Sequence, residues 1–320
     1  MPSRVNPPAV PPAPGAASPT GSPTRSPTTM LTRVKSKLFV HARRRSRGLL
    51  EGEYASVFHG RSLDYDDLRD YVIGDEVRDI DWKATARHTR PLVKRYVAHR
   101  KQNLMLVVDT GRGMAATTRS GEPKKEVAIA AAGLVGWLAQ RHGDLVGLVR
   151  GTATETIAHD LRGTEAHLEL LLRAIDSATT LESAQSNLAS QLRWIIRNVR
   201  RRLFLLVLAD DRELDPATEE LLRRLHVQHE ILWITVEDAD PTAIEAGRTT
   251  YDVSDRHTLP TLVRLDPRVR AAYAAEVAGR VGHTTALLDR RGINHARIGS
   301  SDEVVGAVFA LLERQRRARR

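Results

Sequence analysis

From residue 103 onward, short apolar runs alternate with longer segments in which apolar residues recur every three to four positions. The short runs have the length of buried strands, and the longer segments have the period of helices. We expect strands at 104–109, 145–150, 155–159 (a short edge strand), 203–210, 231–236 and 295–298. We expect helices at 123–140, 164–176, 186–199, 216–225, 267–290 and 301–317. This alternation predicts an α/β domain in which a mainly parallel sheet lies between two layers of helices.

The chain before this region has a different character. Residues 1–30 are dominated by Pro, Ser, Thr, Ala and Gly with almost no large apolar residue, which predicts a disordered arm. Residues 31–100 are highly charged with scattered aromatic residues, and we expect short helices and strands packed on a larger body. Residues 101–320 form that body and end in a basic tail.

The amino-acid composition excludes several kinds of functional site. The chain has no cysteine, which excludes disulfides, thiolate zinc sites, iron–sulfur clusters and a cysteine nucleophile. A hydrophobic content of 41% is enough for a real core. No apolar stretch approaches the roughly 20 residues of a membrane-spanning helix, and the N-terminus lacks the apolar segment of a signal peptide. We expect a soluble, cytoplasmic protein.

The formal net charge of +10 is concentrated in three basic runs, at 33–47, 193–202 and 313–320. The four Phe, six Tyr and four Trp residues are not interleaved with these runs, as stacking on single-stranded nucleic acid would require. Solvated basic arms are therefore favoured over binding to nucleic acid or to anionic lipid.

Two of the expected strands end in aspartate, at Asp109 and at Asp210. In open α/β sheets, ligands bind beyond the carboxyl ends of the strands, so these side chains mark a candidate site if the strands are neighbours. The alternative is that both aspartates only cap loops. Gly111, Gly113 and Ala116 also fit a G-x-G-x-x-A dinucleotide fingerprint, but the polar stretch "TTRSGEP" delays the helix that would face the pyrophosphate.

A long charged motif lies upstream, in the stretch "GRSLDYDDLRDYVIGDEVRDIDWKATARHTRPLVKRY" at 60–96. Together with "DTGRGM" and the strand that ends at Asp210, this stretch resembles the domain of unknown function 58 family, over about residues 48–314. The resemblance implies a three-layer von Willebrand factor A-like (Rossmann-type) body. The signature residues that we single out are Arg69, Gly74, Asp75, Arg78, Asp81, Trp82, Arg87 and Lys94.

The charges of this motif alternate in sign around Trp82. We interpret them as an ion-pair network that pins the segment to the body, with Trp82 as its apolar anchor. A partner-binding surface is the alternative.

The resemblance also bears on metal binding. Von Willebrand A domains that hold a metal use a D-x-S-x-S motif, whose hydroxyls serve as hard ligands to Mg²⁺. Here Gly111 and Gly113 stand at the two serine positions, with Arg112 between them. We expect a degenerate site at Asp109, Gly111, Gly113 and Asp210, neutralised by the Arg112 guanidinium and holding no Mg²⁺. On this interpretation, serines at both glycine positions would restore a metal site.

Other ligand candidates are poor. Thr179, Thr180 and Ser183 are only weak candidates for a third metal ligand. His226, His229 and Glu230 form H-x-x-H-E, but the two histidines fall on different elements, which favours a structural role.

No P-loop, G-x-S-x-G or H-E-x-x-H motif is present. We therefore expect a non-catalytic interaction protein that docks through the Asp109–Asp210 rim, with no cofactor. The resemblance implies that its partner is a MoxR-type AAA+ ATPase, which it would serve as an adaptor or chaperone-like factor. A metal-dependent (Mg or Mn) enzyme or adhesion-type site is one alternative, and a basic nucleic-acid-associated factor is another.

Overall fold

The computed structural model describes residues 29–42, 65–73, 75–87, 90–96, 103–242, 251–253, 258 and 266–318. The expected disordered arm lies outside the described residues except for its last two positions. Gly74 and the side chain of Lys94 also lie outside them.

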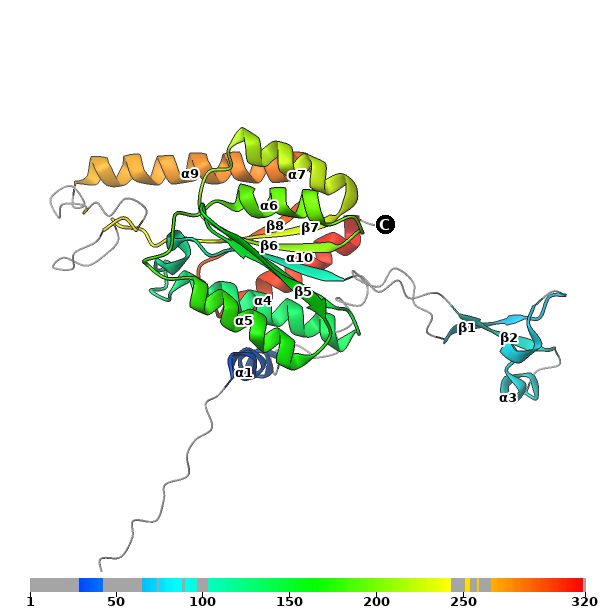
Figure 1. Ribbon diagram of the computed structural model, residues 1–320. Coiled ribbons are helices and arrows are strands. Elements are labelled where there is room, and N and C mark those ends of the chain that lie inside the picture. Colours follow the sequence, from blue (N-terminus) through cyan, green and yellow to red (C-terminus); the bar gives the residue numbers. More distant parts are fainter. Residues whose placement is uncertain are drawn as a thin grey trace, which may run out of the picture.

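The body is built on a six-stranded sheet with the strand order β5-β4-β3-β6-β7-β8 (Figure 1). Five strands run parallel, and β5 pairs antiparallel with β4 at one edge. The strands are β3 (Leu104–Asp109), β4 (Val146–Gly151), β5 (Thr156–Arg162), β6 (Phe204–Asp210), β7 (Glu230–Val236) and β8 (Asn294–Ile298). Every residue of β3, β6 and β7 is buried, as the continuous apolar runs predict.

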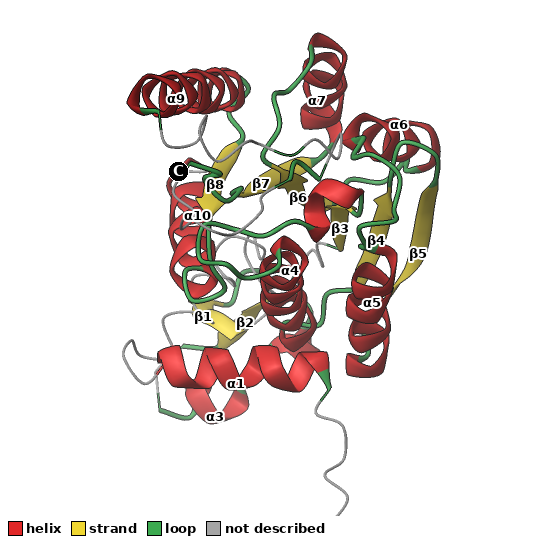
Figure 2. Cartoon of the chain, turned by 90° about the vertical axis from the view of Figure 1, so that its left-hand side faces the viewer, coloured by secondary structure: helices red, strands yellow, loops and turns green. Residues whose placement is uncertain are grey.

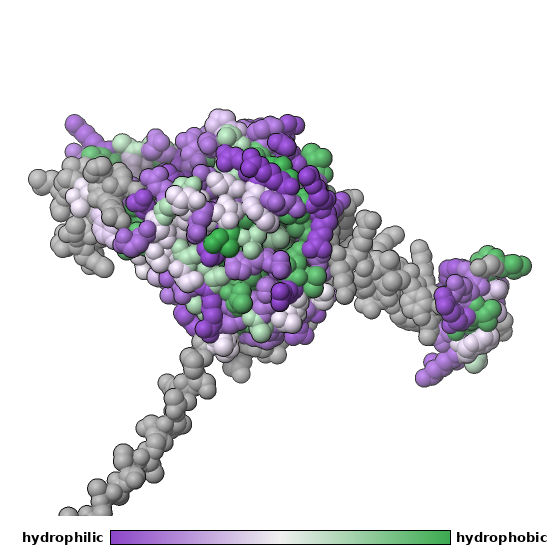
Figure 3. Space-filling view, in the orientation of Figure 1, coloured by the Kyte–Doolittle hydropathy of each residue, from purple (hydrophilic) through white to green (hydrophobic). Residues whose placement is uncertain are grey.

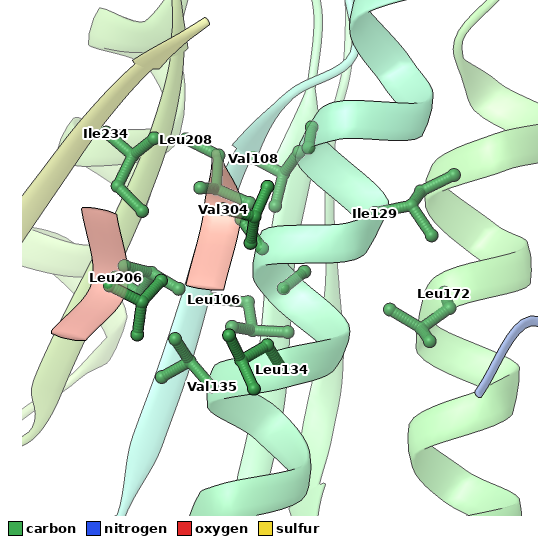
Figure 4. Packing of buried hydrophobic residues seen from close by; sticks show 14 of the residues in the cluster. Leu106, Val108, Ile129, Leu134, Val135, Leu172, Leu206, Leu208, Ile234 and Val304 are labelled. Atoms are coloured by element: carbon green, nitrogen blue, oxygen red, sulfur yellow. The ribbon is translucent and has the colours of Figure 1, made fainter. Parts of the chain in front are cut away.

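Helices cover both faces of the sheet (Figure 2), which confirms the predicted three-layer α/β architecture. One face packs on α4 (Lys124–Arg141), α5 (Glu165–Ala178) and α10 (Val304–Ala318). Figure 4 shows this core, where Leu106 of β3 lies beside Leu134 and Val135 of α4. The other face packs on the helices α6 (Leu188–Asn198), α7 (Pro216–Gln228) and α9 (Pro267–Arg290).

The helix starts follow local chemistry. Thr164, Asp215 and Asp266 each accept a backbone N–H at the beginning of a helix, and proline opens α7 and α9. Helix α10 begins at Val304, three residues later than predicted. The reason is that Ser301 donates both its N–H and its hydroxyl to Glu122, which holds the preceding turn on the opposite loop.

An additional helix, α1 (Met30–Ala42), packs on α4 and α5. Its Leu31 and Val34 side chains are buried in the core of that face. The Glu169 carboxylate of α5 accepts the backbone N–H groups of Met30 (3.2 Å) and Leu31 (2.9 Å). A side chain from the body therefore caps the free amides of this helix start.

The signature segment folds into a small antiparallel unit, which we call the hairpin unit. It contains β1 (Tyr65–Asp70), the 3₁₀ turn η1 (Val77–Asp79), α3 (Trp82–Thr85) and β2 (Leu92–Tyr96), in line with the expectation of short helices and strands. Asp81 caps α3 by accepting the backbone N–H groups of Lys83 and Ala84. Of the described helices, none is both long and apolar enough to cross a membrane.

Candidate functional site

The carboxyl ends of β3 and β6 lie next to each other, because the two strands pair in parallel. Asp109 and Asp210 therefore converge at one edge of the sheet, as the sequence predicts, and we call this place the rim. Both side chains are buried: Asp109 is 2% exposed and Asp210 is 8% exposed. Burial and, to a smaller extent, the nearby charge of Asp210 raise the pKa of Asp109 to about 7, although the hydrogen bond from the Gly111 N–H opposes this rise.

A lysine completes the rim. Lys124 is the first residue of α4, and its side chain is fully buried. Its ammonium group donates to Asp210 Oδ1 and to Asp238 Oδ1, the latter at 2.5 Å. Burial lowers the pKa of Lys124, but these two carboxylates outweigh that effect and leave the pKa above its usual value. Lys124 is therefore held as a cation inside the protein.

Arg297 neutralises the neighbouring part of the rim. Its guanidinium forms two parallel bonds with Asp211, at 2.9 and 2.6 Å, and contacts Glu237 at 3.3 Å. Arg119 continues this network from Glu237 (3.3 Å) to Glu303 (2.6 Å). The charges at this edge of the sheet are thus balanced by basic side chains of the chain itself.

The expectation that Arg112 neutralises the rim is wrong, because Lys124 makes the ion pairs with Asp210 and Asp238. The backbone N–H of Arg112 donates to the Ala184 carbonyl at 2.9 Å, which ties the loop after β3 to the loop before α6.

The two glycines of the loop are closely surrounded. A Cβ atom at Gly111 would overlap with the backbone of Ser186, and one at Gly113 would overlap with Asp210 Oδ2. Serines at these positions would therefore not restore a D-x-S-x-S site, and that expectation is wrong. The glycines are required by the close approach of Ser186 and Asp210.

The residues of the rim do not fit a Mg²⁺ ion. An octahedral site needs hard oxygen ligands around the ion, whereas here an ammonium nitrogen lies between Asp210 and Asp238 and the glycine positions have no space for hydroxyls. In the described parts of the chain, no group of three His, Cys, Asp or Glu side chains has the arrangement of a metal site.

The weak third-ligand candidates have local roles. The Thr179 hydroxyl donates to the Ile175 carbonyl at the end of α5, at 2.8 Å. The Ser183 hydroxyl accepts the backbone N–H of Thr180 (3.1 Å) and so closes a turn. The hydroxyl that does reach the glycine loop belongs to Ser186, which the sequence reasoning missed.

The histidine motif is structural. His229 follows the end of α7, and its Nδ1 accepts the backbone N–H of Leu203 at 3.2 Å. Burial lowers the pKa of His229 to about 4, so the ring is neutral at pH 7. His226 lies within α7, His229 is the residue that follows this helix, and Glu230 begins β7, so the second histidine lies between the two elements and not on the strand.

The charges of the hairpin unit form ion pairs as predicted, but these join residues of the unit itself. Arg69 pairs with Asp75 at 2.5 Å, and Arg90 pairs with Asp70 at 3.2 Å. Arg78 pairs with Glu76. These pairs shape the unit instead of pinning it to the body.

Trp82 is 64% exposed, so the expectation that it is a buried anchor is wrong. Arg87 of the same unit is also exposed. Apolar side chains gather on this unit in Figure 3, where the described ones that are exposed are Val72, Ile73, Val77 and Trp82. We call these four residues the hairpin patch.

Comparisons with known proteins place the chain. A family model described as "Protein of unknown function DUF58" matches residues 67–281. Uncharacterized proteins of Mycobacterium tuberculosis and Mycobacterium bovis are each 28% identical over 236 residues, covering 72% of this chain and 73% of theirs.

Solved structures resemble the chain at low identity. An aerotolerance-related membrane protein from Bacteroides fragilis is 12% identical with a TM-score of 0.43, covering 66% of this chain and 98% of its own. A von Willebrand factor type A protein from Catenulispora acidiphila is 8% identical with a TM-score of 0.36, covering 69% of this chain and 44% of its own.

Proposed function

The chain belongs to the family of unknown function DUF58, and on that premise we propose that it is a non-catalytic protein-interaction module. We further propose that it serves a MoxR-type AAA+ ATPase as an adaptor or chaperone-like factor. The identity of this partner rests on the family resemblance of the charged motif and not on a contact in the structure.

The hairpin patch is the observation that carries the proposal. Val72, Ile73 and Val77 are 60%, 96% and 61% exposed, and Trp82 lies in the same small unit. Several large apolar side chains exposed on one small unit indicate an interaction site, since their burial becomes favourable only when a partner covers them. Tryptophan is also among the residues that contribute most to protein–protein binding. The ion pairs of the hairpin unit suit the polar border that surrounds the apolar centre of such an interface.

This proposal moves the docking surface away from the place expected from sequence. Asp109 and Asp210 are too deeply buried to contact a partner directly. The Asp210 carboxylate is also already engaged by the buried Lys124 ammonium. The hairpin patch, in contrast, presents large side chains to solvent.

The absence of catalysis is likewise a proposal, and the chemistry of the rim supports it. The Lys124 amine is protonated and held between two carboxylates, so it has no free lone pair for attack on a substrate. Asp109 is the group whose pKa would suit a general base, but its buried side chain already accepts the Gly111 N–H at 2.8 Å.

The test is a binding measurement with Trp82→Ala against a purified MoxR-type ATPase from the same cells, in its ATP-bound state. We expect at least a tenfold loss of affinity, because the side chain would lie at the centre of the interface. Val227→Ala is the matched control, since Val227 is an apolar residue of the body that is 86% exposed. The control should bind like the parent protein.

The same variant separates a binding role from a folding role. An exposed tryptophan contributes little to the core, so Trp82→Ala should change the free energy of unfolding by less than about 0.5 kcal/mol. Parental affinity in Trp82→Ala would contradict the proposed surface. A large loss of stability would show instead that the residue anchors the unit.

A further inference from the structure

Among the described lysines and arginines, Lys124 stands out because it alone is buried. A buried ion costs several kcal/mol unless it is paired, so its position requires an explanation. The two carboxylates that it bonds come from different strands: Asp210 ends β6, and Asp238 lies two residues beyond the end of β7. Lys124 thus joins three elements at the point where the sheet would offer a ligand site.

We infer that Lys124 is the resident cation of the rim, and that its ammonium supplies the positive charge that a divalent metal ion would otherwise supply there. It neutralises Asp210 and Asp238 and holds the start of α4 against the ends of β6 and β7. The rim is then complete without any metal. This inference does not depend on the proposed interaction with an ATPase.

The position of Lys124 is fixed by the backbone. Its N–H donates to the Ala116 carbonyl at 2.8 Å, which closes the loop between β3 and α4. The following helix then holds the backbone from which the side chain extends. A cation delivered from a helix start in this way is preorganised, in contrast to a lysine on a surface loop.

The charges of the rim divide into two sets. Arg297 of β8 pairs with both Asp211 and Glu237. Arg119, in the loop before α4, also pairs with Glu237. Asp210 and Asp238 both form ion pairs with Lys124. Loss of Lys124 would therefore leave Asp210 and Asp238 without their internal cation beside buried Asp109, and the arginines, already engaged, would not replace it.

The first measurement is thermal unfolding of the full chain in 5 mM MgCl₂, in 5 mM MnCl₂ and in EDTA. The expected melting temperatures agree within 1 °C, because a ligand that does not bind the native state does not stabilise it. A rise of several degrees with either metal, lost in Asp210→Asn, would overturn the inference.

The second measurement uses Lys124→Met, which keeps the length of the side chain and removes its charge. We expect a fall in melting temperature of more than 5 °C at pH 8. The fall should be smaller at pH 5, below the pKa of about 6 to which burial raises Asp238. Lys125→Met is the matched control: Lys125 is the next residue, its side chain is partly exposed, and it pairs with Asp176 at 2.8 Å. The control should stay within about 1 °C of the parent.

A double variant keeps the inference testable if Lys124→Met fails to fold. Asp210→Asn removes one of the carboxylates that the ammonium neutralises, so Lys124→Met with Asp210→Asn should be more stable than Lys124→Met alone. If the double variant is less stable than Lys124→Met, or if Lys124→Met melts like the parent at both pH values, Lys124 is not the resident cation.

Discussion

Asp109 is a buried acid whose charged form is unfavourable in the folded protein. Its pKa is raised to about 7 by burial and by Asp210, whereas in the unfolded chain it takes its ordinary value near 4. Between about pH 4 and pH 7, the folded state therefore binds a proton that the unfolded state does not. This group lowers the stability of the protein as the pH rises through that window.

Asp109→Asn should remove this dependence. The amide oxygen can still accept the Gly111 N–H, but the side chain no longer ionises. Relative to the parent, the free energy of unfolding of the variant should rise by about 2–3 kcal/mol between pH 5 and pH 8, as measured by urea denaturation at each pH. Asp160→Asn, at an exposed position of β5, is the control and should give no such rise. An unchanged pH profile in Asp109→Asn would show that Asp109 is ionised at both pH values.

Two adjacent lysines show what the sequence can and cannot say about such a site. Lys124 and Lys125 are the same residue type in successive positions, yet one is buried at the rim and the other pairs with Asp176 of α5. Their different roles depend on the direction in which each side chain leaves α4. They also depend on Asp210 and Asp238, which later strands bring to the rim. Asp109 and Asp210 were predictable because each ends an apolar run. The acidic stretch after β7 was an equally visible signal for Asp238.

At the level of elements, β3, β4, β6 and β7 were predictable because they are buried along nearly their whole length and so consist mostly of apolar residues. The hairpin unit was not predictable in the same way. Its strands are short and charged, and the exposure of Trp82 depends on tertiary placement that no local pattern records. Helix α1 carries a visible signal, since Leu31 and Val34 are spaced for one helix face, but only the structure shows that this face lies on α4 and α5.

The packing of α1 on α4 depends on Gly133. A Cβ atom at this position would lie 2.9 Å from Val34 Cγ2 and 3.3 Å from Leu172 Cδ1. Gly133→Ala should therefore destabilise the protein by about 1–2 kcal/mol through overpacking, although alanine is the better helix former. The measurement is the urea midpoint.

Gly279→Ala provides the contrast for that measurement. Gly279 lies in α9 with no atom within 4 Å of the position of a Cβ. Alanine should be neutral or stabilising there, by up to about 1 kcal/mol. If Gly133→Ala stabilises the protein as Gly279→Ala does, then α1 does not pack on α4 in solution. Val34→Ala should restore part of the stability lost in Gly133→Ala.

At the level of the whole molecule, the described residues pack into two cores, one on each face of the sheet, and α1 adds to the first of them. The contacts that dock α1 begin at Met30, which is the last residue of the arm expected to be disordered. Removing residues 1–28 should therefore leave the melting temperature unchanged. Removing residues 1–36 should lower it by several degrees, because Leu31, Val34 and the amides bound by Glu169 are lost. Equal melting temperatures for the two truncations would contradict the docking of α1.

The central place of β3 in the sheet has a consequence for synthesis of the protein. This strand is the first of the six to leave the ribosome, yet Leu104 pairs with Phe204 of β6, which is translated much later. Helices α4 and α6, which pack on its two faces, are translated before β6. The edge of β3 that pairs with β6 has no native partner until β6 is made, and contacts of such long sequence separation form slowly. The nascent chain thus carries an unpaired strand edge through much of its own translation, and it would benefit from a holding chaperone until β6 emerges.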